Sequence, residues 1–76
     1  MKLTPIEGKK LIKILSFIGY FPVRQKGSHV ILEHRESKKI TIVPLRSKDV
    51  GVGLISTILK QVELSREDYF KFLQEI

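Results

Sequence analysis

The sequence predicts an α+β fold in which helices cover one face of a three-stranded antiparallel sheet, in the order α-β-β-β-α-α. Apolar residues first recur with the 3.6-residue period of an amphipathic helix. They then alternate with the period of two that marks half-buried strands, and finally return to the helical period. Short polar turns separate the strands, so consecutive strands are expected to pair antiparallel. We interpret all 76 residues, 1–76, as a single domain.

The first expected helix has signals at both ends. Thr4-Pro5-Ile6-Glu7 fits a capping box, with Thr4 as the N-cap, Pro5 in the first helical position and Glu7 reaching back to the cap. Apolar residues then follow on one helical face: Ile6, Leu11, Ile14, Leu15 and Ile18. Gly19 stands where a helix commonly ends with a glycine in the left-handed conformation.

The three expected strands follow without a long linker. Residues 20–26 and 29–34 read as a hairpin whose loop is Gly27-Ser28, and a glycine in the first loop position suits a type II′ turn. A polar turn leads to a third strand over residues 39–43, which Pro44 ends.

Two further helices are expected after the sheet. The first has Asp49 as its N-cap, and its apolar face is formed by Leu54, Ile55, Ile58, Leu59 and Val62. The second is short and begins at Ser65, which is followed three residues later by Asp68. We expect these helices, like the first, to pack on one face of the sheet.

The two-residue loop fixes the hairpin register, because residues directly opposite each other share a face. The expected pairs are Lys26 with His29, Gln25 with Val30, Arg24 with Ile31, and Val23 with Leu32. The face toward the helices then carries Phe21, Val23, Val30 and Leu32. The open face carries Arg24, Lys26, His29, Ile31 and Glu33. A slip of one residue would mix Arg24 into the apolar set, so the pattern favours this register.

The composition limits the classes of function. Fourteen Lys and Arg against eight Asp and Glu give a net charge of +6, which favours a polyanionic partner, nucleic acid before a membrane surface. Without cysteine there is no disulfide or thiolate chemistry, and two histidines alone make a zinc site improbable. We therefore expect no metal and no cofactor. No apolar run approaches the roughly 20 residues that cross a bilayer, and no signal peptide is visible, so the cytoplasm is expected.

His29 is the candidate catalytic residue because it lies on the open face beside two cations. Metal-free RNA cleavage needs a base for the ribose 2′-OH, an acid for the leaving 5′-oxygen, and positive charge for the transition state. Arg24 and Lys26 are expected to bind phosphate, and Ser28 to orient the histidine or the phosphate. Arg46, Lys48 and Asp49, in the loop after the third strand, are expected to approach a bound backbone, and Lys48 is the candidate binding residue among them.

Other interpretations of the same residues are open. Gly-Ser-His is also what a tight turn followed by a polar strand residue looks like, and the loop around Lys48 can be merely solvated. His34 reads as a histidine at a strand end or turn with a structural role. A non-catalytic RNA-binding module and a domain that binds an acidic protein are the competing functions.

Several segments together resemble a known family. They are "GKKLIKILSFIGYFPVRQKGSH", "RQKGSHVILEH" and "ITIVPLRSKDVGVGLISTILKQVELSREDYFKFL". These segments are similar to the HicA-type messenger-RNA interferase toxins of bacterial and archaeal toxin–antitoxin systems, over essentially the whole chain. The resemblance implies a double-stranded-RNA-binding-like fold and endoribonuclease activity on messenger RNA, with His29 of Gly27-Ser28-His29 as the catalytic residue. It also implies a HicB-type antitoxin as protein partner, which binds the toxin and blocks the site. We expect neither a membrane nor DNA as a partner.

Overall fold

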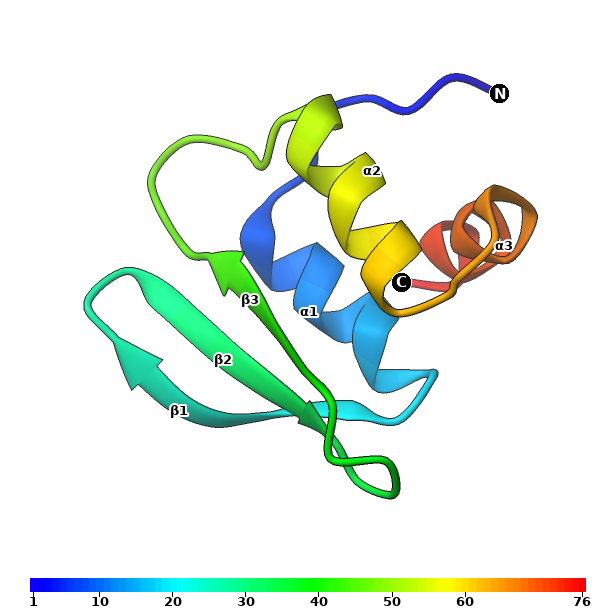
Figure 1. Ribbon diagram of the computed structural model, residues 1–76. Helices are drawn as coiled ribbons and strands as arrows, with labels where there is room; N and C mark the ends of the chain where they lie inside the picture. The colour runs from blue at the N-terminus through cyan, green and yellow to red at the C-terminus, as the bar shows by residue number, and fades with distance from the viewer.

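The computed structural model describes residues 1–76, and its centre is one three-stranded antiparallel sheet in the order β1-β2-β3 (Figure 1). The strands are β1 (Tyr20–Lys26), β2 (His29–His34) and β3 (Ile40–Pro44). The first two have the expected bounds, while the third is shifted by one residue and includes its proline. Pro44 is tolerated because it ends an edge strand.

Helices cover one face of this sheet and leave the other open, which confirms the predicted α+β architecture. The helices are α1 (Gly8–Ser16), α2 (Val52–Gln61) and α3 (Arg66–Glu75). Helix α1 contacts β1 and β3, and α2 contacts β3. Helix α3 lies on the side of α1 away from the sheet (Figure 1), where the rings of Phe72 and Phe17 are 5.1 Å apart. None of the helices has the length and apolar character that crossing a bilayer requires.

The core lies between the sheet and the helices. On the sheet side, Val30, Leu32 and Val43 are buried, and they alternate with outward residues as strand geometry requires. On the helix side the expected stripe of α1 is confirmed at Leu11, Ile14 and Leu15, all fully buried. Helix α2 contributes three further apolar residues to this core: Ile55, Ile58 and Leu59.

The predicted start of the first helix at Thr4 is wrong. Helix α1 begins at Gly8, and its N-cap Glu7 makes no side-chain cap. The preceding chain is extended instead, because Ile6 pairs with Val50 in an antiparallel bridge. Its N–H donates to the Val50 carbonyl at 3.2 Å, and the Val50 N–H donates back at 2.7 Å. Both side chains are buried. The free energy gained by burying them in this bridge therefore exceeds what one more turn of helix would contribute.

The predicted N-cap of the second helix, Asp49, is also wrong, and the same bridge is the reason. Asp49 precedes the bridge and is exposed, and α2 starts only after Gly51, its N-cap. The third predicted cap is confirmed: the Ser65 hydroxyl accepts the Asp68 N–H at 3.1 Å and opens α3. The difference is that Ser65 caps its own local turn, whereas Asp49 lies in a segment whose path a distant residue sets.

The hairpin register is confirmed for the three pairs next to the loop and wrong beyond them. A bulge at Val23 puts an extra residue into β1, so that Pro22 rather than Val23 faces Leu32. An inserted residue reverses which side chains face inward. Phe21 and Val23, expected in the core, are therefore exposed by 38% and 57%.

Tyr20 takes the place in the core that Phe21 and Val23 were expected to fill. It is only 4% exposed, and its ring packs edge-on against His34 with the centroids 5.0 Å apart. His34 Nδ1 accepts the backbone N–H groups of Glu36 and Ser37 at 3.2 and 3.1 Å, which shapes the turn before β3. His34 therefore has the structural role expected of it.

Gly19 allows this packing in two ways. Its φ of +92° is strained for any residue with a side chain, and a Cβ here would lie 2.8 Å from His34 Nε2.

We predict that Gly19→Ala destabilises the protein by about 1–3 kcal/mol, measured by denaturant unfolding. Gly53→Ala is the matched control, since Gly53 lies in α2 with open space around it, and it should leave stability unchanged or slightly raised. Equal stability of both variants would contradict this account of the turn.

Candidate nucleic-acid site

His29 is the first residue of β2, and its side chain is exposed on the open face. It is directly opposite Lys26 on β1 and Pro44 on β3. Neither ring nitrogen takes part in any of the protein's side-chain hydrogen bonds. An imidazole without protein partners on the central strand of the sheet is accessible to a ligand.

The loop before His29 is held by local chemistry. Gly27 has a φ of +61°, which a type II′ turn requires in its first position, and nothing lies within 4 Å of where its Cβ would be. The Gln25 side-chain amide donates to the Gly27 carbonyl at 3.1 Å across the turn. The glycine is thus needed for its conformation rather than for space.

A second segment reaches the same end of the sheet. The Leu45 N–H donates to the Ser28 carbonyl, which ties the chain after β3 to the hairpin loop. Arg46 and Lys48 follow on this segment and are exposed. Together with Pro44 they line a hollow of about 200 Å³ in the structure. Since Pro44 is opposite His29, the loop after β3 and the hairpin border one surface.

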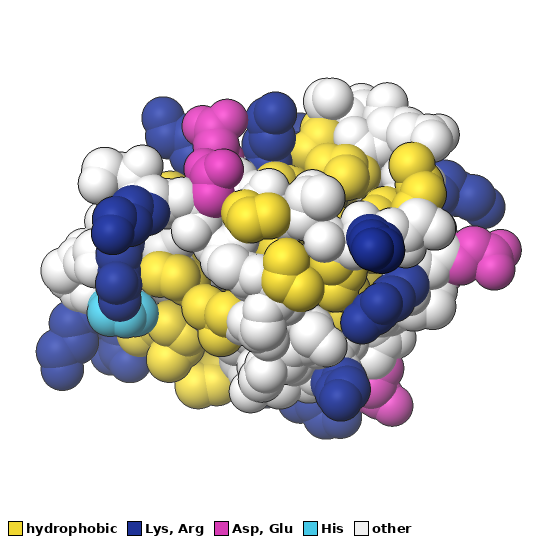
Figure 2. Space-filling model, turned by 90° about the horizontal axis from the view of Figure 1, so that it is seen from above, with side chains coloured by type: hydrophobic (Ala, Val, Ile, Leu, Met, Phe, Trp, Pro, Cys, Tyr) yellow, Lys and Arg dark blue, Asp and Glu magenta, His cyan; other side chains and the backbone are white.

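We call the resulting group the basic cluster, and its members are Arg24, Lys26, His29, Arg46 and Lys48. Neither of the two salt bridges in the protein includes any of them, so none of these side chains has a carboxylate oxygen within 4.0 Å. Figure 2 shows one histidine with Lys and Arg side chains close to it at one side of the view. Such a cluster attracts phosphate groups, and the attraction weakens with salt.

The structure brings together most of the residues that the sequence predicted for the site. Arg24 and Lys26 lie on the open face, opposite Ile31 and His29. Ser28 is half-buried in the loop, with its carbonyl used by Leu45. Lys48 lies in the loop after β3 and lines a hollow with Pro44, the residue opposite His29. Pro44 was missed as a neighbour of His29, because only the pairing of β2 with β3 shows it.

The open face also carries apolar side chains that were not expected there. Apart from Ile31, which was expected there, they are Phe21, which was expected in the core, and Ile40 and Ile42, for which no face was predicted. On β3 the outward residues are isoleucines, while Thr41 points inward, is 3% exposed and donates its hydroxyl to the Gln61 side-chain oxygen at 3.0 Å. The Arg35 guanidinium lies over the Phe21 ring, 5.2 Å from its centroid, at the end of this face away from His29.

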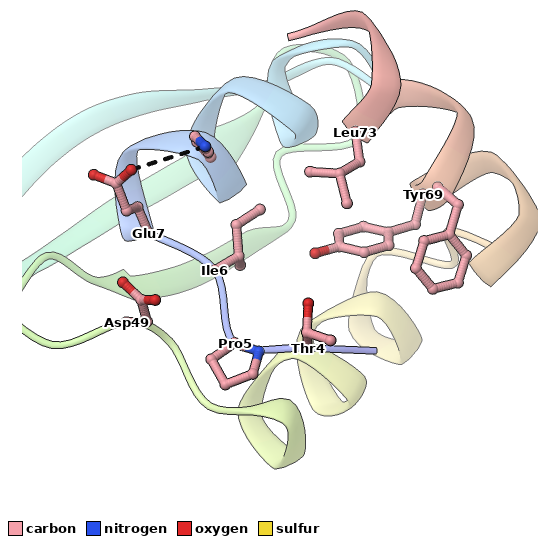
Figure 3. Close-up of a pocket in the computed structure, with 9 residues that line it drawn as sticks. Thr4, Pro5, Ile6, Glu7, Asp49, Tyr69 and Leu73 are labelled. Atoms are coloured by element: carbon pink, nitrogen blue, oxygen red, sulfur yellow. Dashed lines mark ion pairs between the residues drawn. The ribbon is translucent and has the colours of Figure 1, made fainter. Parts of the chain in front are cut away.

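Another hollow, of about 250 Å³, shares no lining residue with the basic cluster. It lies between the N-terminal segment and α3, and Figure 3 shows the Tyr69 hydroxyl pointing into it toward Thr4 and Ile6. Tyr69 is 1% exposed, and burial raises the pKa of its phenol above 10.0. We therefore relate Tyr69 to the packing of α3 against the N-terminal segment, and not to the basic cluster.

The comparisons with known proteins agree with this geometry. The order α-β-β-β-α-α, with helices on one face of an antiparallel sheet, defines a double-stranded-RNA-binding-like domain. The profile of the family described as "HicA toxin of bacterial toxin-antitoxin" matches residues 8–64 of the 76-residue chain, well over half of it. The chain therefore belongs to the HicA toxin family, which confirms the resemblance noted in the sequence. Membership implies a toxin of a toxin–antitoxin system, with an antitoxin as partner. No curated protein matches the chain.

Tyr69 gives a pH prediction. Its pKa is raised in the folded protein because burial disfavours the phenolate. The neutral phenol thus contributes stability that is fully present below pH 10.0 and is lost as the pH rises through the folded pKa. Unfolding free energies of wild type and Tyr69→Phe, measured from neutral to alkaline pH, should show a smaller alkaline loss in the variant. If the unfolding free energies of the two proteins fell in parallel as the pH rose, the stabilising role of the neutral Tyr69 phenol would be contradicted.

Proposed function

We propose that this chain is a toxin that cleaves messenger RNA without a metal ion, with His29 as the general acid/base. One observation carries the proposal: His29 is exposed on the open face, without a protein partner, among cations that have no carboxylate oxygen within 4.0 Å. Membership of the HicA toxin family supports it, since that family consists of toxins.

The reaction follows from the chemistry of the phosphodiester. His29 takes the proton of a ribose 2′-OH, and the 2′-oxygen attacks the neighbouring phosphorus. The bond from phosphorus to the 5′-oxygen breaks, and that oxygen takes a proton from the Lys26 ammonium or from water. The products are a 2′,3′-cyclic phosphate on the upstream fragment and a free 5′-OH on the downstream fragment. His29 then returns its proton to solvent, and a proton from solvent restores the Lys26 ammonium where that group was the donor.

The cations have separate roles in this proposal. Arg24 and Lys26, next to His29 on the open face, bind the reacting phosphate and stabilise its added negative charge. Lys48 holds the RNA backbone on the side of the loop after β3. Ser28 orients the histidine or the phosphate from the turn. With one histidine to handle protons, we expect slow cleavage.

The partners follow from the same proposal. The substrate is messenger RNA, and cleavage in the cytoplasm stops translation and growth. A HicB-type antitoxin binds the chain and blocks this activity.

The first test compares wild type with His29→Ala. Expression of wild type should arrest growth, and purified wild type should cleave RNA in the presence of EDTA. His29→Ala should do neither while keeping its circular dichroism spectrum and melting temperature, because the residue is exposed and unbonded. Equal toxicity of the two proteins would refute the mechanism, as would loss of cleavage on chelation. Salt-sensitive RNA binding without any cleavage would identify a binding module instead.

A second test concerns the basic cluster. Arg24→Gln and Lys26→Gln should each weaken RNA binding and reduce the slope of log K against log salt by about 0.7 for each phosphate that is no longer neutralised. Lys71→Gln is the matched control, an exposed lysine on α3 outside the cluster, and it should leave the slope unchanged. Fluorescence anisotropy with single-stranded RNA at several salt concentrations measures this. The same slope change in all three variants would show that the cluster does not form the RNA site.

A further inference from the structure

A groove runs between the outer edge of β3 and helix α2. Strand β3 is at the edge of the sheet, paired only with β2. The groove is a hollow of about 340 Å³ in which no charged side chain takes part. Its lining comes from β3 (Ile40, Thr41, Ile42) and from α2 (Leu54, Thr57, Ile58, Gln61).

The backbone of β3 at this groove is open for pairing. The His34 N–H donates to the Lys39 carbonyl, and the Leu45 N–H donates to the Ser28 carbonyl. In an antiparallel ladder these bonds recur at every second residue, so Thr41 and Val43 bond to β2 between them. The N–H and C=O groups of Ile40 and Ile42 therefore point to the outer edge. An edge of this kind is a template for an added strand.

The side chains around this edge are apolar and uncovered. Ile40 is 59% exposed, Ile42 is 44% exposed, and Leu54 on α2 is 41% exposed. Contiguous exposed apolar residues mark interaction sites more often than they mark ordinary surface. A strand added here would lay one row of side chains on α2 and the other beside the two isoleucines, on the open face.

Positive charge stands at both ends of the groove. At one end are Lys39, which precedes Ile40, and Lys60, which lies one turn after Thr57. Glu63 forms a salt bridge with Lys39 at 3.8 Å and leaves Lys60 without a carboxylate partner. At the other end Leu54 also lines the hollow with Arg46 and Lys48, against the single carboxylate of Asp49. Figure 2 shows hydrophobic side chains in the centre of the view, with Lys and Arg side chains on both sides.

The charges at the two ends favour one of two possible occupants of the β3 edge, a second copy of this chain or an extended segment of another protein. Pairing of β3 with β3 of a second copy in antiparallel order would bring the cations of one copy against those of the other, so like charges oppose a homodimer here. An extended segment with apolar residues in its centre and carboxylates at its ends matches both the edge and the charges.

We propose that the antitoxin adds such an acid-flanked, apolar segment to the outer edge of β3 as a fourth strand. The inference rests on the proposed function in one respect, that the partner is an antitoxin.

The length of the pairing is limited at Pro44, which has no N–H. Its carbonyl oxygen is 2.6 Å from where a Cβ of Gly8 would lie, so α1 closes the edge there. The segment therefore pairs along Ile40–Ile42.

The added strand would also affect the basic cluster. Neighbouring strands are about 4.8 Å apart, so it would lie roughly 10 Å from β2. Its carboxylate at the Pro44 end would stand beside Arg46 and Lys48, where the RNA backbone is expected to pass. Docking at β3 would thus compete with RNA for these cations.

The test is amide hydrogen exchange of the toxin, free and in its purified complex with the cognate antitoxin. The amides of Ile40 and Ile42 should exchange fast in the free chain and become protected in the complex. Those of Thr41 and Val43, already bonded to β2, serve as internal references. A complex in which Ile40 and Ile42 exchange as they do in the free chain would overturn the docking site and leave the RNA-cleavage proposal standing.

Affinity measurements with three variants complete the test. Ile42→Pro removes an outward N–H and leaves the ladder to β2 intact, and Leu54→Lys puts a charge on the α2 side. Each should raise the Kd for the antitoxin about tenfold or more. Val23→Lys is the matched control, an exposed apolar residue at the bulge of β1, and it should leave the Kd unchanged. If the first two variants bind as wild type does, the proposal is wrong.

Discussion

The period of two along β2 is the constraint on which the rest of the molecule depends. This strand is paired on both sides, so its register cannot change without breaking both ladders. Val30 and Leu32 are thereby held in the core, and His29 and Ile31 are held outside. Because helices cover one face only, the outward residues stay uncovered. The core and the exposed histidine are two consequences of the same pairing.

The open face and the neighbouring β3 edge divide into two regions. At the hairpin end, turn geometry and the bond from Leu45 to Ser28 bring cations from two segments around His29. Along β3, the outward isoleucines and an open backbone edge border α2. Arg46 and Lys48 lie between these regions. A polyanion and a protein segment would therefore compete for the same cations, which is a physical basis for inhibition of a toxin by its partner.

The sequence allowed the strands of the hairpin, its loop, the stripe of α1 and the Ser65 cap to be predicted, because each depends on local periodicity or on a turn. The bulge at Val23 was not predictable in this way, since it depends on burying Tyr20 against His34, a residue on the next strand. The false helix start at Thr4 has a similar cause: the bridge between Ile6 and Val50 joins distant segments. No face was predicted for β3, because its outward Ile40 and Ile42 are as apolar as its inward Val43, and its inward Thr41 is satisfied only by a side chain of α2.

The central claim is that His29 starts an attack by the ribose 2′-OH, and the chemistry of the cleaved RNA ends tests it most directly. Wild-type protein would be incubated with a defined RNA in EDTA, and the fragments analysed by mass spectrometry. The account predicts a 2′,3′-cyclic phosphate upstream and a 5′-OH downstream, both absent with His29→Ala. A 3′-OH paired with a 5′-phosphate would contradict it, because those ends arise when water or hydroxide attacks instead of the neighbouring 2′-oxygen.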